Sequence, residues 1–186
     1  MWAWLRRRNL KSTDFVECLV TFADEWSRDI CHRLEPEKGV ISEDVRELIA
    51  AEFIWFAIHM LSREAHEKVG AERRPCIIDS ILSYMVLRSC SELDNAQDPE
   101  TVLSVLLNIL DETESLYSAC PELLSKGKIL SGSGLFNVAT SRILGLVGNI
   151  ENPITIMGIQ HSLVNAWSVL DMRKWVKIIN KDCPRV

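Results

Sequence analysis

The chain has 186 residues, of which 47% are hydrophobic and 25% are charged, and its formal net charge is −5. These values are typical of one globular domain and exclude extended disorder. The acidic balance argues against a nucleic-acid-binding protein whose affinity depends on an overall positive charge.

The N-terminal part of the chain predicts two helices. Thr13 can cap a first helix that ends near Leu34, where a proline and a glycine follow. Ser42 is the next capping residue, and the two acids after it suit the positive end of the helix dipole. This second helix, over residues 42–69, is expected to end at a glycine.

Four further helices are predicted in the rest of the chain. Two of them begin at a capping residue followed by proline, at Asp98 and Asn152, which is a strong start signal. Their expected ranges are about 75–93, 98–117, 135–149 and 152–180. The chain has no β-hairpin signal. We therefore expect a single all-α domain over residues 1–186, with about six helices in a bundle or orthogonal array and a basic, mobile segment at 1–12.

The second helix carries the candidate site. Between Leu48 and Leu61 it is apolar on nearly every side, which predicts a helix at the centre of the domain. At about 100° per residue, four polar side chains fall in one narrow sector of this helix. They are Glu52, His59, Arg63 and His66.

Two interpretations of this polar sector are open. In the first, Glu52, His59 and Arg63 line a pocket that binds a small molecule or carries out catalysis. In the second, they form an internal network that ties the helix to its neighbours, because a buried charge without a partner is costly. The spacing is wrong for a metal, since residues seven apart lie about 10.5 Å apart along a helix. We assign no catalytic residue, no metal ligand and no cofactor.

The six cysteines are scattered and include no C-x-x-C pair. We interpret them as reduced thiols, several of which act as small core residues, and expect no structural disulfide. The N-terminal arginines are not followed by an apolar stretch, so we expect no secretory signal peptide. Together these features predict a cytoplasmic protein.

The span from Ile129 to Leu170 has only two formal charges, at Arg142 and Glu151. Helices that face water normally carry charged residues on that side. We therefore expect residues 129–170 to include the interface of a homodimer, and a lysine at Val164 or Val169 to disrupt it.

The N-terminal end combines tryptophan with arginine, a pattern found at membrane surfaces. Peripheral membrane contact is therefore an alternative use of these residues, whereas a membrane span is disfavoured by the polar residues in the only long uncharged helix. The residues concerned are Trp2, Trp4, Arg6, Arg7 and Arg8.

Two functions follow from these observations. The first is a non-enzymatic interaction or regulatory module that self-associates through its uncharged C-terminal helices, with an unidentified protein as a further partner. The alternative is a small-molecule-binding protein or enzyme with a polar pocket at Glu52, His59 and Arg63. Nothing in the sequence indicates a nucleic-acid partner.

Overall fold

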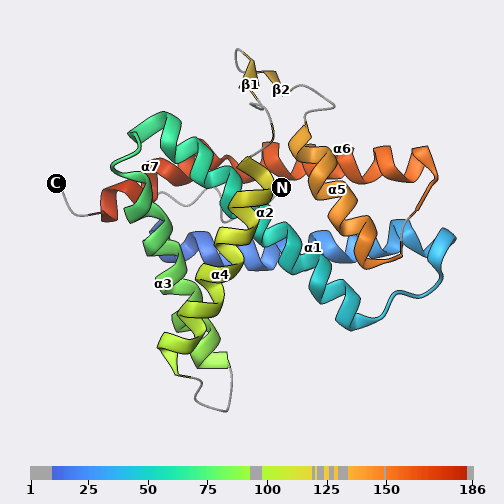
Figure 1. Cartoon of the computed structure of the whole chain (residues 1–186), viewed down its shortest axis with the longest axis horizontal. Helices are drawn as coiled ribbons and strands as arrows, with labels where there is room; N and C mark the ends of the chain where they lie inside the picture. Colours follow the sequence, from blue (N-terminus) through green and yellow to red (C-terminus); the bar gives the residue numbers. More distant parts are fainter. Residues whose placement is uncertain are drawn as a thin grey trace. The chain divides into compact units, whose positions relative to one another are not determined.

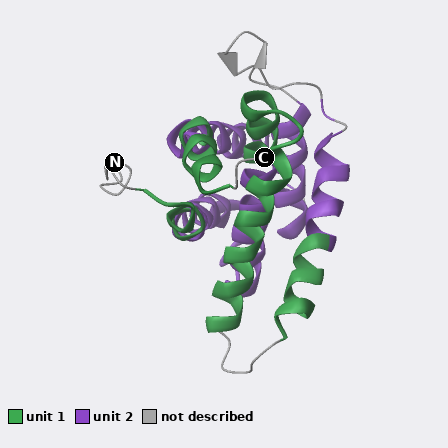
Figure 2. Cartoon of the chain, turned by 90° about the vertical axis from the view of Figure 1, so that its left-hand side faces the viewer, with its two compact units in different colours: residues 1–18, 60–107, 172–186 green, residues 19–59, 108–171 purple. Residues whose placement is uncertain are grey.

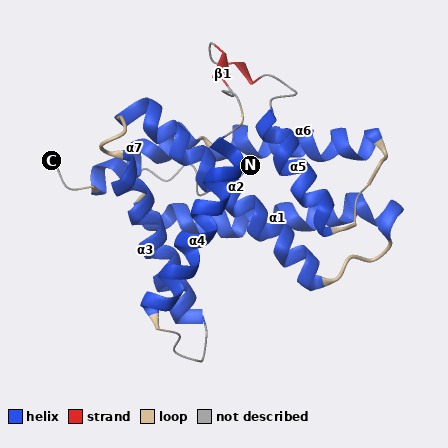
Figure 3. Ribbon diagram, viewed as in Figure 1, coloured by secondary structure: helices blue, strands red, loops and turns tan. Residues whose placement is uncertain are grey.

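The computed structural model describes residues 10–92, 98–118, 120, 124–125, 128–129, 134–148 and 150–183. Helices make up most of this described part (Figures 1 and 3), so the prediction of an all-α protein is confirmed. Within it the helices are α1 (Ser12–Lys38), α2 (Glu43–Val69), α3 (Arg74–Glu92), α4 (Pro99–Ser118), α5 (Gly134–Leu146), α6 (Pro153–Leu170) and α7 (Met172–Asp182).

Three predicted capping residues begin their helices. The Ser42 hydroxyl accepts a hydrogen bond from the Val45 amide at 3.4 Å. The Asp98 carboxylate accepts from the Thr101 amide at 3.2 Å, and the Asn152 side-chain oxygen accepts from the Ile154 amide at 3.0 Å. These bonds satisfy amides that have no partner inside the helix, so the starts predicted at Asp98 and Asn152 are confirmed.

Helix α1 is longer than the sequence indicates. The prediction that it ends near Leu34 is wrong, because the helix continues through Pro36 to Lys38. A proline has no amide hydrogen to donate to the carbonyl four residues earlier. In the last turn, however, residues after the proline can still donate to the helix carbonyls. Here the Gly39 amide donates to the Glu35 carbonyl at 2.8 Å, and Gly39 has a φ of 72°, which favours glycine.

The predicted helix over 152–180 is two helices, which gives seven in the described residues instead of six. The chain leaves α6 at Asp171, whose φ of 43° and ψ of 63° are left-handed. A left-handed residue ends a helix, and aspartate tolerates this conformation better than most side chains.

A small hairpin lies between α4 and α5. Strand β1 (Leu124–Ser125) pairs antiparallel with β2 (Lys128–Ile129), with Leu124 opposite Ile129. The sequence carries no signal for this hairpin. Strands of two residues are too short to show an alternating pattern in the sequence.

The chain divides into two compact units, coloured separately in Figure 2. Unit 1 contains residues 1–18, 60–107 and 172–186, and unit 2 contains residues 19–59 and 108–171. Helices α1, α2 and α4 each contribute residues to both units. The single domain over 1–186 stays a prediction. Residues 1–9 lie outside the described residues, and they include the tryptophans and arginines for which membrane contact was the alternative.

Unit 1 is built around the buried side of α7. Trp175 is fully buried, and its ring packs edge-on against Phe15 with the centroids 5.3 Å apart. The Arg73 guanidinium binds the last turn of α7, where Nε donates to Asn180 Oδ1 at 3.0 Å. Arg173 donates to Glu64, a carboxylate that is almost completely buried, at 2.9 Å. Such charge-assisted bonds fix α7 to other parts of unit 1.

Unit 1 also contains a disulfide between Cys76 in α3 and Cys183, one residue after α7. The prediction that all six cysteines are reduced thiols is therefore wrong for this pair. The two residues are separated by 107 positions, so no local spacing could indicate their contact. The cytoplasmic prediction relied on reduced thiols, and this pair removes that support.

Unit 2 has an aromatic core. Phe53 of α2 lies 4.5 Å from Trp26 and 5.6 Å from Phe22 of α1, measured between ring centroids. The Trp26 indole donates from Nε1 to the Ser162 hydroxyl of α6 at 3.0 Å. Stacked and tilted ring pairs stabilise the fold by more than the burial of their area alone. The indole hydrogen bond joins α1 to α6.

Candidate functional site

The four residues of the predicted site differ in exposure. In unit 2, the Glu52 side chain is 11% exposed and His59 is buried. In unit 1, Arg63 is half-buried and His66 is exposed. Glu52 and His59, the polar residues on the apolar stretch of α2, are therefore both largely buried. The position of α2 at the centre of the domain stays a prediction.

Glu52 bonds to side chains from two other helices of unit 2. The Tyr117 hydroxyl in α4 donates to Glu52 Oε1 at 2.8 Å, and Arg142 Nε in α5 donates to the same oxygen at 2.5 Å. Tyr117 is fully buried, and the Arg142 side chain is 35% exposed. The network expected as the alternative to a pocket is thus present at Glu52. We call Glu52, Tyr117 and Arg142 the Glu52 cluster.

Tyr117 also links the two predicted residues of unit 2. Its ring centroid lies 5.3 Å from that of His59, with 38° between the ring planes. Tyr117 packs edge-on against Phe56 as well, at 5.8 Å. Glu52 and His59 are about two turns apart on the same face of α2, so both can contact the same tyrosine.

The electrostatics of the cluster favour a fixed hydrogen bond. Burial, followed by the charge of Glu52, raises the pKa of the Tyr117 hydroxyl far above its usual range. The hydrogen bond to Glu52 raises the pKa of Arg142. Tyr117 consequently remains a donor and Arg142 remains a cation at physiological pH. This arrangement joins three helices through side chains that hydrogen-bond one another.

Sequence reasoning missed both partners of Glu52. Tyr117 lies at the end of α4 and Arg142 in the middle of α5, and neither belongs to a motif. One signal was present, because Arg142 is one of only two formal charges between Ile129 and Leu170. A lone arginine in such a stretch indicates a buried or half-buried acid elsewhere in the chain.

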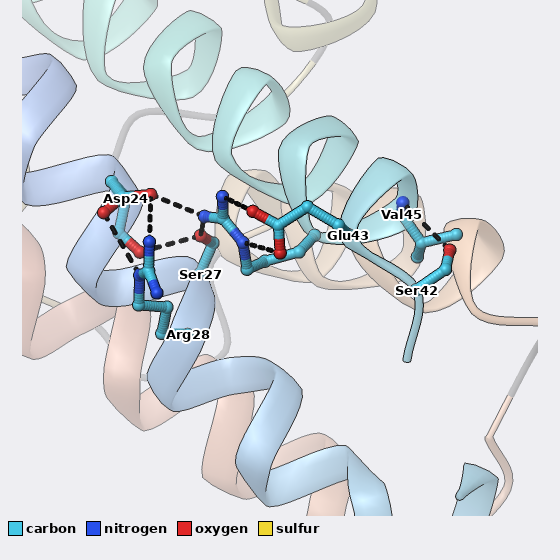
Figure 4. Close-up of polar contacts among 7 residues, drawn as sticks. Asp24, Ser27, Arg28, Ser42, Glu43 and Val45 are labelled. Atoms are coloured by element: carbon cyan, nitrogen blue, oxygen red, sulfur yellow. Dashed lines mark hydrogen bonds and ion pairs between the residues drawn. The ribbon is translucent and has the colours of Figure 1, made fainter. Parts of the chain in front are cut away.

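A second charged cluster of unit 2 surrounds Arg46 in α2. Its partners Asp24, Ser27 and Glu43 are labelled in Figure 4. Its guanidinium donates to Asp24 Oδ1 at 2.6 Å, to the Ser27 hydroxyl at 3.0 Å and to Glu43 Oε2 at 2.8 Å. The Arg46 side chain is 11% exposed, whereas those of Asp24 and Glu43 are 44% and 64% exposed. This Arg46 cluster joins α1 to the first turn of α2.

The Arg46 cluster lowers the pKa of both its acids. A hydrogen bond from Arg28, and then one from Arg46, lowers the pKa of Asp24. The hydrogen bond from Arg46 lowers the pKa of Glu43. Both carboxylates are therefore ionised at neutral pH and hold the same cation.

The solvent side of α6 is uncharged. Its buried residues are Ile159, Leu163, Ala166 and Leu170. On the opposite side it exposes two large apolar residues near its start, with Ile154 81% and Met157 66% exposed. Exposed polar residues continue this side, which we call the α6 face; it consists of Ile154, Met157, His161, Asn165, Ser168 and Val169.

A groove of about 450 Å³ runs between α5 and α6. Its walls include Asn137 and Ser141 of α5, Ile156 and Gln160 of α6, and one acidic residue, Glu151, just before α6. Gln160 donates to Asn137 Oδ1 at 2.6 Å across the groove. The groove follows the side of α6 next to the α6 face, so the two form one continuous, largely uncharged surface.

The described residues include no group of three or more His, Cys, Asp or Glu side chains placed to hold a metal ion. On α1, Asp29 pairs with Arg33, and His32 pairs with Glu35. In the part of the chain that the structure describes, no helix has the length and apolar character needed to cross a bilayer.

Comparisons of the chain with protein-family models, with curated proteins and with solved structures found no match.

Proposed function

We propose that this protein is a non-enzymatic interaction module that self-associates through the α6 face. The carrying observation is that α6, over its 18 residues, has no acidic or basic residue apart from His161, yet exposes Ile154 and Met157 to solvent. Adjacent exposed apolar side chains on an uncharged helix side support a protein contact, because contiguous apolar patches on a surface often mark interaction sites.

A second copy of the chain is the partner that this surface fits. A charged partner would gain no ion pair from the α6 face and would have to be desolvated. The same face of a second copy carries no charge either. Two copies related by a twofold axis can therefore pack these faces together without leaving a charge unpaired. The Glu52 cluster does not enter the proposal, because its groups bond one another.

The size of the surface sets the expected affinity. A helix of this length is about 27 Å long and about 10 Å wide, which gives a footprint of about 270 Å². Stable interfaces bury about 800 Å² per partner, so α6 alone is too small. The α5–α6 groove can take part of the second copy and enlarge the contact. We therefore expect a reversible dimer with a dissociation constant in the micromolar range.

Sedimentation equilibrium and light scattering between about 5 and 200 µM test the proposal. We expect a mass that rises from the 21.2 kDa of the chain toward twice that value. Met157→Lys should stay monomeric, because the pair would bury two unpaired charges. The matched control is Val40→Lys, which places the same charge at a residue that is 94% exposed and outside α6, and should dimerise normally.

The exposed fractions of the side chains decide which position of α6 should be changed to lysine. Val164 is half-buried and Val169 is 39% exposed, so a lysine at either position would also disturb packing within the chain. Met157 is the cleaner position for that reason. A mass that stays at 21.2 kDa up to the highest concentration would refute self-association, as would a dimer that Met157→Lys leaves intact.

A further inference from the structure

His161 is the only titratable residue of the α6 face, and it occupies the middle of that face. The exposed positions 154, 157, 161, 165 and 168 are three or four residues apart, so they lie along one side of α6. His161 is exposed, and its Nδ1 lies 3.1 Å from Asn165 Nδ2.

The middle position has a geometric consequence for a symmetric pair. In a parallel pair, every residue of the contact meets its own counterpart. In an antiparallel pair that crosses at the centre of the face, only the central residue does so. Both arrangements place His161 against His161 of the partner subunit, whichever direction the second helix runs.

The charged groups near α6 do not reach this position. On α1, Glu37 binds Asn152 and Thr155 at the first turn of α6, while Asp29 and Arg33 bind each other. On α5, Arg142 is bound to Glu52.

Glu151 and Asp171 flank α6, each ten residues from His161 along the chain. Glu151 lines the α5–α6 groove together with Gln160. The contact that the structure gives for His161 is with Asn165, an uncharged side chain.

We propose that His161 makes self-association dependent on pH, with the neutral imidazole in the dimer and the protonated imidazole in the monomer; this inference rests on the proposed function. Histidine is the side chain that ordinarily changes charge between pH 5 and 8. Pairing would bring two imidazolium groups together in a contact that excludes water, so the monomer binds protons more readily than the dimer. By linkage, a fall in pH therefore shifts the equilibrium toward the monomer.

Sedimentation equilibrium at about pH 8 and about pH 5.5 tests the inference. For the wild type we expect the dissociation constant to rise about tenfold or more at the lower pH. His161→Gln keeps a polar side chain without a titrating group and should dimerise equally at both pH values. His161→Lys should be monomeric at both, since its charge is permanent.

His32→Gln is the matched control, because His32 is an exposed histidine of α1 in the same unit and lies outside the α6 face. This variant should keep the pH dependence of the wild type. Circular dichroism at both pH values checks that each variant remains folded.

The outcomes separate the two proposals. A wild-type dimer that is equally strong at both pH values overturns the role of His161 and leaves self-association standing. The role of His161 is likewise overturned if His161→Gln dissociates on acidification as much as the wild type does. A wild type that is monomeric at about pH 8 and about 200 µM overturns self-association and this inference with it.

Discussion

In unit 1 a covalent bond joins α3 to the residue after α7, whereas in unit 2 the helices are joined by hydrogen-bonded charges. Unit 1 adds the contacts of Arg73 with Asn180 and of Arg173 with Glu64 to its disulfide. Unit 2 relies on the Glu52 and Arg46 clusters around its aromatic core. The difference teaches that the stability of unit 1 should depend on redox conditions, and that of unit 2 on pH and single charges.

The disulfide should give the largest effect. Cys76 and Cys183 are separated by 107 positions, and closing a loop of that size stabilises the folded chain by about 5 kcal/mol in the chain-entropy model. We expect a reducing agent to lower the urea midpoint of the wild type by a corresponding amount. Cys76→Ser should unfold at that lower midpoint with or without reductant.

Cys31→Ser is the control for this prediction, since Cys31 is buried in unit 2 and outside the disulfide. Its midpoint should still fall on reduction. Equal urea midpoints for the oxidised and reduced wild type would show that the disulfide does not stabilise unit 1.

Glu52→Ala should have the next largest effect, a loss of about 3 kcal/mol in the free energy of unfolding. The substitution leaves the Tyr117 hydroxyl buried without its acceptor and Arg142 without its counterion. Urea titration at neutral pH measures the loss.

Arg28→Ala provides a comparison in the same unit, because it removes an ion pair with Asp24 whose side chains are 63% and 44% exposed. Exposed pairs contribute about 0–1 kcal/mol, so this variant should remain close to the wild type. If Glu52→Ala were equally mild, the Glu52 cluster would not hold unit 2 together.

Arg46→Gln should have a smaller effect than Glu52→Ala, a fall of about 2–4 °C in Tm at neutral pH. The folded-state pKa values of Asp24 and Glu43 lie below their usual values. Their stabilisation is therefore present above about pH 4, where the unfolded carboxyls are already ionised, and is lost as pH falls through the lowered values.

Thermal melts of the wild type and of Arg46→Gln across this range test the sign. The difference in Tm between them should shrink as the pH falls below about 4. A difference that grows in acid would contradict the assigned pKa directions.

The sequence predicted most of the helices but few of the contacts that join one helix to another. Caps such as Asp98 and Asn152 act on amides two or three residues away, so their pattern is visible in the chain itself. The partners of Glu52 are 65 and 90 positions away, and that of Cys76 is 107 positions away. Contacts at such separations depend on tertiary packing, which periodicity and spacing do not encode.

The candidate site was predictable to the same extent. The apolar surroundings of Glu52 on α2 indicated a largely buried acid in need of partners, and the structure supplies them. The lack of charge between Ile129 and Leu170 drew attention to α6. Which side of α6 faces solvent depended on its packing, and the structure shows Met157 to be far more exposed than Val169.

The turn at Asp171 resolves a conflict of phase. The buried positions of α6 are 159, 163, 166 and 170, and those of α7 are 172, 175, 176 and 179. On one continuous helix, at about 100° per residue, the second set would point roughly half a turn away from the first. In one straight helix, Trp175 would therefore lie on the side opposite to the one that buries Leu163. One residue in a left-handed conformation rotates the chain between the two stripes, so the apparent irregularity at Asp171 is what allows both to be covered.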